Sequence, residues 1–254
     1  MKVALIQTSL IWENPLENRS HLAQKICGFM EDVDLIVLPE MFSSGFTMNP
    51  QAVAEKMDGE TVQWLQHLAK AKDCAITGSL VIEEKGNYYN RLVFVYPSGE
   101  VKWYDKRHLF TLAGEHQHYT AGVDKLIVEW KGFKICPLVC YDLRFPVFSR
   151  NVEGYDVLIY VANWPKPRTN AWDILLKARS VENICYTIGV NRIGTDHNNH
   201  DYIGHSQVVD YLGEYVLEPQ EADAVFIVEL DKAKLIETRN KLNFLNDKDN
   251  FELS

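Results

Sequence analysis

The segment "ICPLVCYDLRFP", residues 135–146, begins as an apolar run and turns sharply polar directly after Cys140. Its apolar part predicts a buried β-strand, because it is short and rich in aliphatic side chains. Cys136 falls within this strand, whereas Cys140 stands at its end. A side chain at a strand end is held by a rigid sheet yet can project into a cleft. Cys140 is therefore a candidate reactive thiol, although a buried structural thiol would also fit this residue on its own.

Strand patterns of this kind alternate with helical patterns along most of the chain. Helical spacing of apolar residues predicts helices within 22–30, 59–72 and 171–183. Turn signals such as "PSGE" at 97–100 predict hairpins, which exclude a purely parallel doubly wound fold. We therefore expect a mixed α/β fold whose sheets are covered by helices. The predicted strands are 2–7, 34–39, 74–83, 91–97, 101–105, 126–130, 133–140, 156–163, 184–192, 204–211, 214–219 and 224–230.

The whole chain, residues 1–254, is predicted to form one domain. Of its residues 46% are hydrophobic and 24% charged, which is ordinary for a globular protein with a large core. No linker rich in proline, glycine or serine divides the sequence. The last part, from about 236 to 254, is polar with scattered leucine and phenylalanine, and it predicts a C-terminal arm.

Composition also limits the partners and the compartment. The longest apolar run, 157–162, is far too short to span a bilayer, and the first residues predict a strand and not a signal peptide. A net charge of −9 argues against nucleic acid or an anionic membrane as partner. Five cysteines without framework spacing fit a reducing compartment. We therefore expect a cytoplasmic protein with neither a membrane nor a nucleic-acid partner.

Three residues share the placement just past a predicted strand. Glu40 follows "DLIVLP", Lys106 follows "VKWYD", and Cys140 closes "FKICPLVC". Taken singly, Glu40 and Lys106 would pass for solvated loop residues. Occurring as a set, in the motifs "LPEMF", "YDKRHLF" and "CYDLRFP", they resemble the Glu-Lys-Cys set of the nitrilase superfamily of carbon–nitrogen hydrolases. The resemblance extends over nearly the whole chain.

The resemblance implies a fold, an assembly and a reaction. The fold is a four-layer α-β-β-α sandwich, and two chains usually join into a homodimer through their helical faces. The reaction is hydrolysis through a cysteine thioester, with no metal and no organic cofactor. A second glutamate of the family matches Glu115 in "LAGEHQHY", where it would help to position Lys106 and the substrate amide.

Elementary chemistry assigns a role to each member of the set. A thiol attacks an amide carbon as thiolate, so Cys140 needs a base, and Glu40 can take its proton. Lys106 supplies a positive charge that favours the thiolate and stabilises the oxyanion of the tetrahedral intermediate. The backbone N–H of Tyr141, directly after the nucleophile, is the expected second donor of the oxyanion hole.

Finer resemblance points to the omega-amidase branch, particularly its bacterial members. The matching blocks are "PLVCYDLRFPVFSR" and "VANWPKPRTNAWDILLKARSVENICYTIGVNRIG". The branch hydrolyses the omega-amides of short keto acids, 2-oxoglutaramate and 2-oxosuccinamate. Such substrates carry a distal carboxylate, which arginine holds well in a fork.

Arg168 is the candidate for that distal carboxylate, with Arg144 and Lys166 behind it. Arg144 is expected to have a structural role, pairing with a nearby acid to hold the turn after Cys140. Phe42 and Trp164 are expected to wall the pocket, although core packing is the alternative for both.

Other functions stay open at this stage. The same triad could act on carbamoyl amines, on other small aliphatic amides or on nitriles, and a non-catalytic binding protein could keep the sandwich. Papain-type chemistry would need a histidine signature around Cys140, which is lacking. A metal site at His116 and His118, or at His197 and His200, lacks a convincing ligand set. The second histidine pair is expected in a polar loop at the mouth of the site or at a subunit contact.

Overall fold

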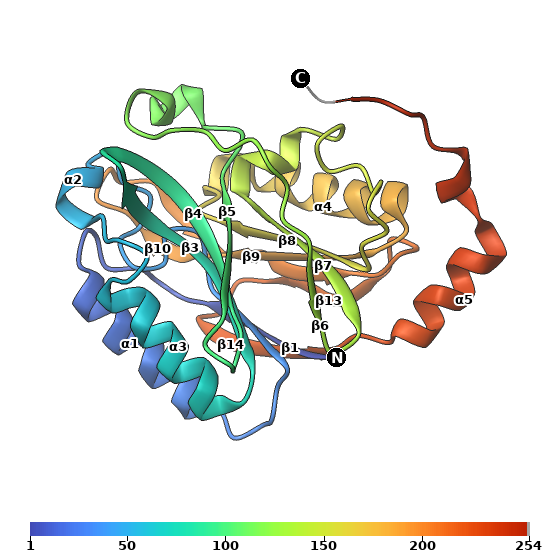
Figure 1. Ribbon diagram of the computed structural model, residues 1–254, viewed down its shortest axis with the longest axis horizontal. Coiled ribbons are helices and arrows are strands. Elements are labelled where there is room, and N and C mark those ends of the chain that lie inside the picture. Colours follow the sequence, from blue (N-terminus) through green and yellow to red (C-terminus); the bar gives the residue numbers. More distant parts are fainter. Residues whose placement is uncertain (253–254) are drawn as a thin grey trace.

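Two six-stranded β-sheets face each other between outer layers of helices in the computed structural model, which describes residues 1–252 (Figure 1). The predicted four-layer α-β-β-α sandwich is thereby confirmed. The first sheet has the order β14-β1-β2-β3-β4-β5 and the second β13-β12-β9-β8-β7-β6. The first sheet comprises β1 (Lys2–Gln7), β2 (Leu35–Val37), β3 (Ala75–Glu84), β4 (Asn87–Val95), β5 (Val101–Asp105) and β14 (Ala224–Glu229). The second comprises β6 (Val128–Trp130), β7 (Phe133–Val139), β8 (Val157–Ala162), β9 (Tyr186–Asn191), β12 (Ser206–Val209) and β13 (Tyr215–Gln220).

Helices cover the outer faces, and a small hairpin lies apart from the sheets. The hairpin pairs β10 (Ile193–Thr195) with β11 (Asp201–Ile203). The helices are α1 (Pro15–Gly28), α2 (Pro50–Val53), α3 (Glu60–Lys72), α4 (Thr169–Asn183) and α5 (Lys232–Leu242). Short 3-10 helices occur at Thr111–Ala113, Glu115–Gln117, Cys140–Arg144, Lys166–Arg168 and Phe244–Asp247.

Strand periodicity explains why the first sheet is buried on both faces. Along β1, Val3 and Leu5 join the apolar cluster between the two sheets, whereas Ala4 and Ile6 join the cluster that includes α1 and α3. Successive side chains of a strand point to opposite faces, so one apolar run supplies both clusters. Each fully buried aliphatic side chain of this kind contributes roughly 1.5–3 kcal/mol.

All twelve predicted strands and all three predicted helices are present, most with boundary shifts of a few residues, and the first helix begins earlier, at Pro15. Met30, expected on a helical face, lies beyond the end of α1 and is 93% exposed. Helix α2, the β10-β11 hairpin and the 3-10 helices were not predicted, because each is too short to give a periodic signal.

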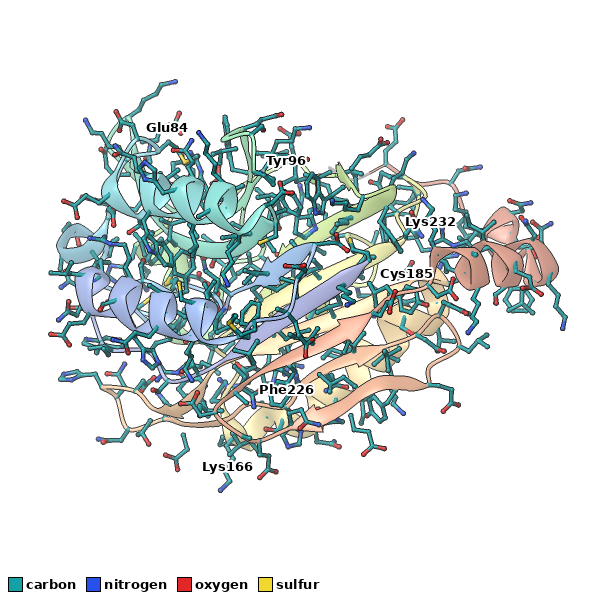
Figure 2. All side chains as sticks on the ribbon, turned by 90° about the horizontal axis from the view of Figure 1, so that it is seen from below. Glu84, Tyr96, Lys166, Cys185, Phe226 and Lys232 are labelled. Atoms are coloured by element: carbon teal, nitrogen blue, oxygen red, sulfur yellow. The ribbon has the colours of Figure 1, made fainter. Side chains whose placement is uncertain are left out.

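The C-terminal arm expected from about 236 contains a helix that begins earlier, at Lys232. Asp231 caps it by accepting a hydrogen bond from the backbone N–H of Lys234 (3.1 Å). Arg239 donates to Asp156 (2.8 Å) and thereby ties α5 to the second sheet, and Leu235 is buried. Beyond these ties α5 extends away from the sandwich, as Figure 2 shows next to Lys232. Residues 253–254 of the expected arm lie outside the described part of the chain.

Parallel strands at the centre of each sheet bring several strand ends to one edge. Strands β1, β2 and β3 run parallel, as do β7, β8 and β9. Polar side chains that follow such strands gather at the carboxyl edge, where α/β folds present their sites. Among residues 1–252, no helix is both long and apolar enough to cross a membrane.

Candidate active site

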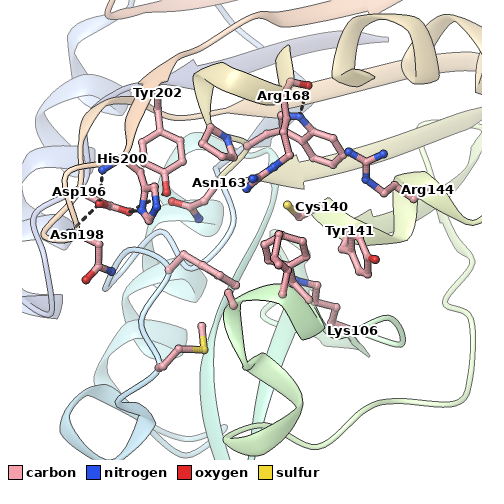
Figure 3. Close-up of a pocket in the computed structure, with 17 residues that line it drawn as sticks. Lys106, Cys140, Tyr141, Arg144, Asn163, Arg168, Asp196, Asn198, His200 and Tyr202 are labelled. Atoms are coloured by element: carbon pink, nitrogen blue, oxygen red, sulfur yellow. Dashed lines mark hydrogen bonds and ion pairs between the residues drawn. The ribbon is translucent and has the colours of Figure 1, made fainter. Parts of the chain in front are cut away.

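A cavity of about 310 Å³ opens at this edge and is lined by residues from both sheets. Lys106 follows β5 of the first sheet, whereas Cys140 and Asn163 follow β7 and β8 of the second. Figure 3 shows these side chains around one pocket, which Arg144 and Arg168 also line. The structure thus brings two of the three predicted triad residues to the pocket wall, and the third, Glu40, lies directly behind it.

The backbone at Cys140 adopts a left-handed conformation with φ of 44°, which is unfavourable for a residue with a Cβ. Asp142 holds this turn, since its Oδ2 accepts from the Val139 N–H (3.0 Å) and the Tyr104 hydroxyl (2.8 Å). Its Oδ1 accepts from the backbone N–H of His108 (3.1 Å). The strained turn therefore stays closed and presents the thiol at the pocket.

Tyr141 follows the nucleophile candidate inside the 3-10 helix Cys140–Arg144. The first N–H groups of a helix have no partner within it, so they can bind a negative charge. The Tyr141 ring packs edge-on against Phe110 and Phe145, with ring centres 5.0 and 5.1 Å apart. These contacts hold the Tyr141 side chain beside Cys140.

Glu40, Lys106 and Glu115 form one buried ionic network. The Lys106 Nζ lies 2.9 Å from Glu40 Oε1 and 2.9 Å from Glu115 Oε2, and all three side chains are fully buried. Glu115 Oε2 also accepts from the Phe110 N–H (2.5 Å). The sequence placed these residues on three separate segments, and the structure brings them together as the resemblance implied.

Two asparagines that the sequence reading missed complete the network. Asn90 Nδ2 donates to Glu40 Oε1 (2.9 Å) and to Glu115 Oε1 (3.2 Å), which reduces the repulsion between the carboxylates. The Asn163 backbone N–H donates to Glu40 Oε2 (2.8 Å). A signal existed for both: Asn90 is a polar residue in a buried strand, and Asn163 directly follows a strand, as Cys140 does.

Burial and charge set the protonation of the site. Burial of its ammonium alone would lower the pKa of Lys106, but Glu115 and Glu40 outweigh it and hold that pKa above its usual range. Burial raises the pKa of Glu115; Lys106 opposes this rise and Glu40 adds to it. The network thus keeps Lys106 charged, and the one ammonium group is shared by two carboxyl groups.

Lys106 favours the thiolate of Cys140, as its charge predicts, but two other influences outweigh it. Burial, and then the Glu40 carboxylate, raise the pKa of the Cys140 thiol well above its usual value, although Lys106 acts in the opposite direction. A thiolate would add another negative charge beside the Glu40 carboxylate. Cys140 is therefore a neutral thiol at rest, and Glu40 is placed to take its proton during attack.

We expect alkylation of Cys140 by iodoacetamide to accelerate steadily as the pH rises. Its thiolate fraction grows only toward the raised pKa, and the thiolate is the reacting form. The rate is measured by mass spectrometry of the Cys140 peptide, with exposed Cys27 as internal control. A rate that is already constant between about pH 6 and 8, as for a thiolate of low pKa, would contradict the neutral resting thiol.

The residues expected around the substrate are placed differently. Trp164 and Arg168 line the pocket, and the Trp164 Nε1–H donates to the Arg168 carbonyl (2.7 Å). Phe42 does not line it: the ring is fully buried against Trp64 in the core beneath α3. The strand end puts Phe42 two residues past Glu40 on the helix side of the sheet, and Phe46 lines the pocket in its place.

Arg144 also departs from expectation. It does not pair with an acid within residues 1–252; its guanidinium lies 5.0 Å from the centre of the Trp164 ring, on the pocket wall. The turn after Cys140 that it was expected to hold is held by Asp142 instead.

The polar loop with His197 and His200 was expected at the mouth of the site or at a subunit contact. It lies at the pocket. Asp196 organises this loop, since its Oδ1 accepts from the backbone N–H of His200 (2.9 Å) and its Oδ2 from the Tyr202 hydroxyl (2.8 Å). In residues 1–252 no three histidine, cysteine or acidic side chains are grouped so as to hold a metal ion.

The four-layer sandwich thus carries a buried carboxylate–lysine cluster and a cysteine at its pocket. The carbon–nitrogen hydrolase family model matches residues 2–240, and the chain belongs to this family. The protein is thus an enzyme that hydrolyses carbon–nitrogen bonds.

Named relatives narrow the comparison. The chain is 44% identical to omega-amidase YafV of Escherichia coli K12, covering 100% of this chain and 98% of that protein. It is 31% identical to 2-oxoglutaramate amidase of Bacillus subtilis, covering 96% of each. The crystal structure of XC1258 from Xanthomonas campestris, a CN-hydrolase superfamily protein with an arsenic adduct in its active site, has a TM-score of 0.97 and 42% identity, covering 100% and 99% of the two chains. These relatives support amide hydrolysis.

Proposed function

We propose that this enzyme is an omega-amidase, which hydrolyses the terminal amide of short keto-dicarboxylic acid monoamides such as 2-oxoglutaramate and 2-oxosuccinamate. The observation that carries the proposal is one pocket lined by a thiol, by the lysine of a buried carboxylate–lysine network and by two arginines. An amide with a distal carboxylate matches these groups. The names of the two relatives above support the same substrate class.

The first half-reaction forms a thioester. The Cys140 thiol gives its proton to Glu40 as its sulfur attacks the amide carbon, and the carbonyl oxygen becomes an oxyanion. Lys106 and the Tyr141 N–H donate hydrogen bonds to this oxyanion. Glu40 then passes the proton to the amide nitrogen, the carbon–nitrogen bond breaks, and ammonia leaves.

The second half-reaction returns the free thiol. A water molecule gives a proton to Glu40 and attacks the thioester carbon, so that an oxyanion forms again. As the carbon–sulfur bond breaks, the proton returns from Glu40 to Cys140 and the carboxylic acid is released. Glu115 stays paired with Lys106 throughout and keeps the ammonium directed at the oxyanion.

The distal carboxylate of the substrate is assigned to Arg168, with Arg144 close by. The Arg168 guanidinium lies 5.2 Å from the Phe110 ring centre, and within the described chain neither arginine is ion-paired with a carboxylate. Both cations are therefore available to a ligand, and stacking on aromatic rings pre-orients their planar donors. An acidic substrate thus meets a local positive field although the whole chain carries −9.

Replacing Arg168 with alanine should raise KM for 2-oxoglutaramate about tenfold to a hundredfold with a smaller effect on kcat. A hydrogen bond to a charged group contributes roughly 1.5–3 kcal/mol, and this one lies away from the reacting atoms. Steady-state ammonia release measures the effect. Lys166→Ala is the matched control, because Lys166 lies in the same 3-10 helix but is exposed. An unchanged KM would move the carboxylate site to Arg144.

Ammonia release from four substrates tests the function: 2-oxoglutaramate, glutamine, carbamoylputrescine and a simple nitrile. Preference for 2-oxoglutaramate, lost in Cys140→Ala, is the expected result. Activity on carbamoylputrescine alone would establish the alternative, a hydrolase of carbamoyl amines. Activity on glutamine alone would remove the keto-acid specificity.

The assembly and compartment belong to the same proposal. Apolar side chains stand exposed on the outer layer at Ile174 and Val181 of α4 and at the neighbouring Leu212, which lies in a turn packed on Val181. We assign this face to a homodimer joined through α4. All five cysteines are free, which fits a cytoplasmic enzyme.

A further inference from the structure

We infer that Asn163 Oδ1 accepts a hydrogen bond from the NH₂ group of the scissile amide, so that the site selects a carboxamide over the matching ester. The inference rests on the amide hydrolysis proposed above and adds a residue to it. Asn163 lines the pocket, is 5% exposed, and its Oδ1 is buried without a hydrogen-bond partner in the described chain.

The orientation of the Asn163 side chain follows from its own contacts. Its Nδ2 donates to the Glu40 carbonyl oxygen (2.6 Å), which accepts only. The amide group cannot be turned over without placing two oxygens against each other, so Oδ1 is fixed as the atom that is left unpaired. An unpaired buried acceptor costs roughly 1–3 kcal/mol, and a donor that arrives with the substrate removes this cost.

Strand register brings the residue Asn163 close to the nucleophile. Strands β7 and β8 are parallel, and Val139 pairs with Val161. Cys140 and Asn163 therefore leave adjacent strands at the same edge, and both face the pocket in Figure 3.

The contacts of Glu40 indicate which substrate atom lies at Asn163. Lys106 and Asn90 occupy Oε1 of Glu40, whereas the Asn163 backbone N–H occupies Oε2. The carbonyl oxygen of the substrate belongs with Lys106, since an ammonium stabilises an oxyanion. The amide nitrogen must lie within hydrogen-bond reach of the Glu40 carboxyl that protonates it. The Glu40 oxygen that Lys106 does not occupy is Oε2, which lies next to Asn163. The amide nitrogen is therefore expected on the side of Asn163.

A carboxamide and its methyl ester share the acyl part and the carbonyl group and differ in the leaving group, NH₂ or OCH₃. The NH₂ group can donate to Asn163 Oδ1, whereas the ester oxygen cannot and would face it as a second acceptor. Sites built to bind a substrate N–H reject the analogue that lacks it, because their own polar group then stays unpaired. Asn163 thereby gives the pocket a preference that the Glu-Lys-Cys set alone does not supply.

The test compares kcat/KM for a primary amide and for its methyl ester in wild type and in Asn163→Ala. We expect the variant to lose roughly tenfold more activity on the amide than on the ester, which is the fold-change for one hydrogen bond of about 1.4 kcal/mol. Equal losses on both would assign Asn163 only to positioning Glu40 and would overturn the inference.

Asn90→Ala is the matched control. Asn90 also donates to Glu40 and also has an unpaired buried Oδ1, but it does not line the pocket. Its loss should lower amide and ester hydrolysis alike and leave their ratio unchanged. A ratio that falls as far as in Asn163→Ala would show a general effect through Glu40 and would contradict the inference.

A second measurement leaves Asn163 in place. A crystal structure of Cys140→Ala with the bound amide should place the amide nitrogen within about 3.2 Å of Asn163 Oδ1, and a nitrogen that points elsewhere overturns the inference. Another primary amide may replace 2-oxoglutaramate in both experiments. If the enzyme hydrolyses such an amide but not 2-oxoglutaramate, the proposed substrate fails while the inference is still tested.

Discussion

Replacing Cys140 with alanine will abolish amide hydrolysis and leave the fold intact. The side chain carries the attacking sulfur, and removing a nucleophile of this kind costs about 10⁶ in kcat. The turn around it is held by Asp142 through backbone and side-chain donors that the substitution does not touch. Alanine has the same Cβ as cysteine, so the left-handed backbone is no more strained than before.

Ammonia release and thermal unfolding, measured on the same preparation, check this result. Cys136→Ala is the matched control: Cys136 is fully buried on β7, the strand that leads to Cys140, and it belongs to the core between the sheets. That variant should lose some stability and keep its turnover. Residual hydrolysis above a few per cent in Cys140→Ala would remove the thiol from the chemistry.

Replacing Lys106 with methionine will lower both activity and stability. The oxyanion loses a charged donor, which costs about 10²–10³ in kcat. Removing one partner of a buried ionic network is also strongly destabilising, by roughly 3–5 kcal/mol, because the remaining charges stay buried without compensation. Here those charges are the carboxylates of Glu40 and Glu115.

The stability loss in Lys106→Met should depend on pH in a defined direction. Burial and Glu40 already raise the pKa of Glu115, and loss of the ammonium removes the contact that opposes this rise. A carboxyl group with a raised pKa binds its proton more tightly in the folded state than in the unfolded state. The deficit should therefore be largest above the raised pKa and shrink as the pH falls through it.

Denaturant unfolding of wild type and variant at several pH values measures this dependence. Lys102→Met is the control, since Lys102 lies on β5, the strand that leads to Lys106, and is 44% exposed. It should have little effect at any pH. A deficit in Lys106→Met that grows toward acid pH would contradict the buried carboxylate pair.

The layered fold was predictable because its strands carry strong local signals. Apolar runs such as β1 and β8 are short and rich in branched side chains, which favours a strand over a helix. For the C-terminal arm, the sequence predicted the arm but not its helix. Helix α5 has one buried side chain, Leu235, and depends on its N-cap and on Arg239. Long-range contacts of that kind leave no periodic pattern in the sequence.

The site residues also fall into those that the sequence could locate and those that it could not. Glu40, Lys106 and Cys140 stand at strand ends and belong to recognisable motifs, so the sequence located them. Phe42 was misplaced because a strand end gives no direction for a side chain two residues further on. Asn90 was missed because its role depends on the approach of Glu40 and Glu115 from distant segments, which the sequence does not show.

The reacting groups come from both halves of the sandwich. Glu40 and Lys106 follow strands of the first sheet, whereas Cys140 and Asn163 follow strands of the second. Neither half holds a working set, and the pocket exists only where the two meet. In a refolding experiment, recovery of turnover therefore reports when the two sheets have docked. Circular dichroism records when the strands and helices form. Ammonia release records when the two halves have come together.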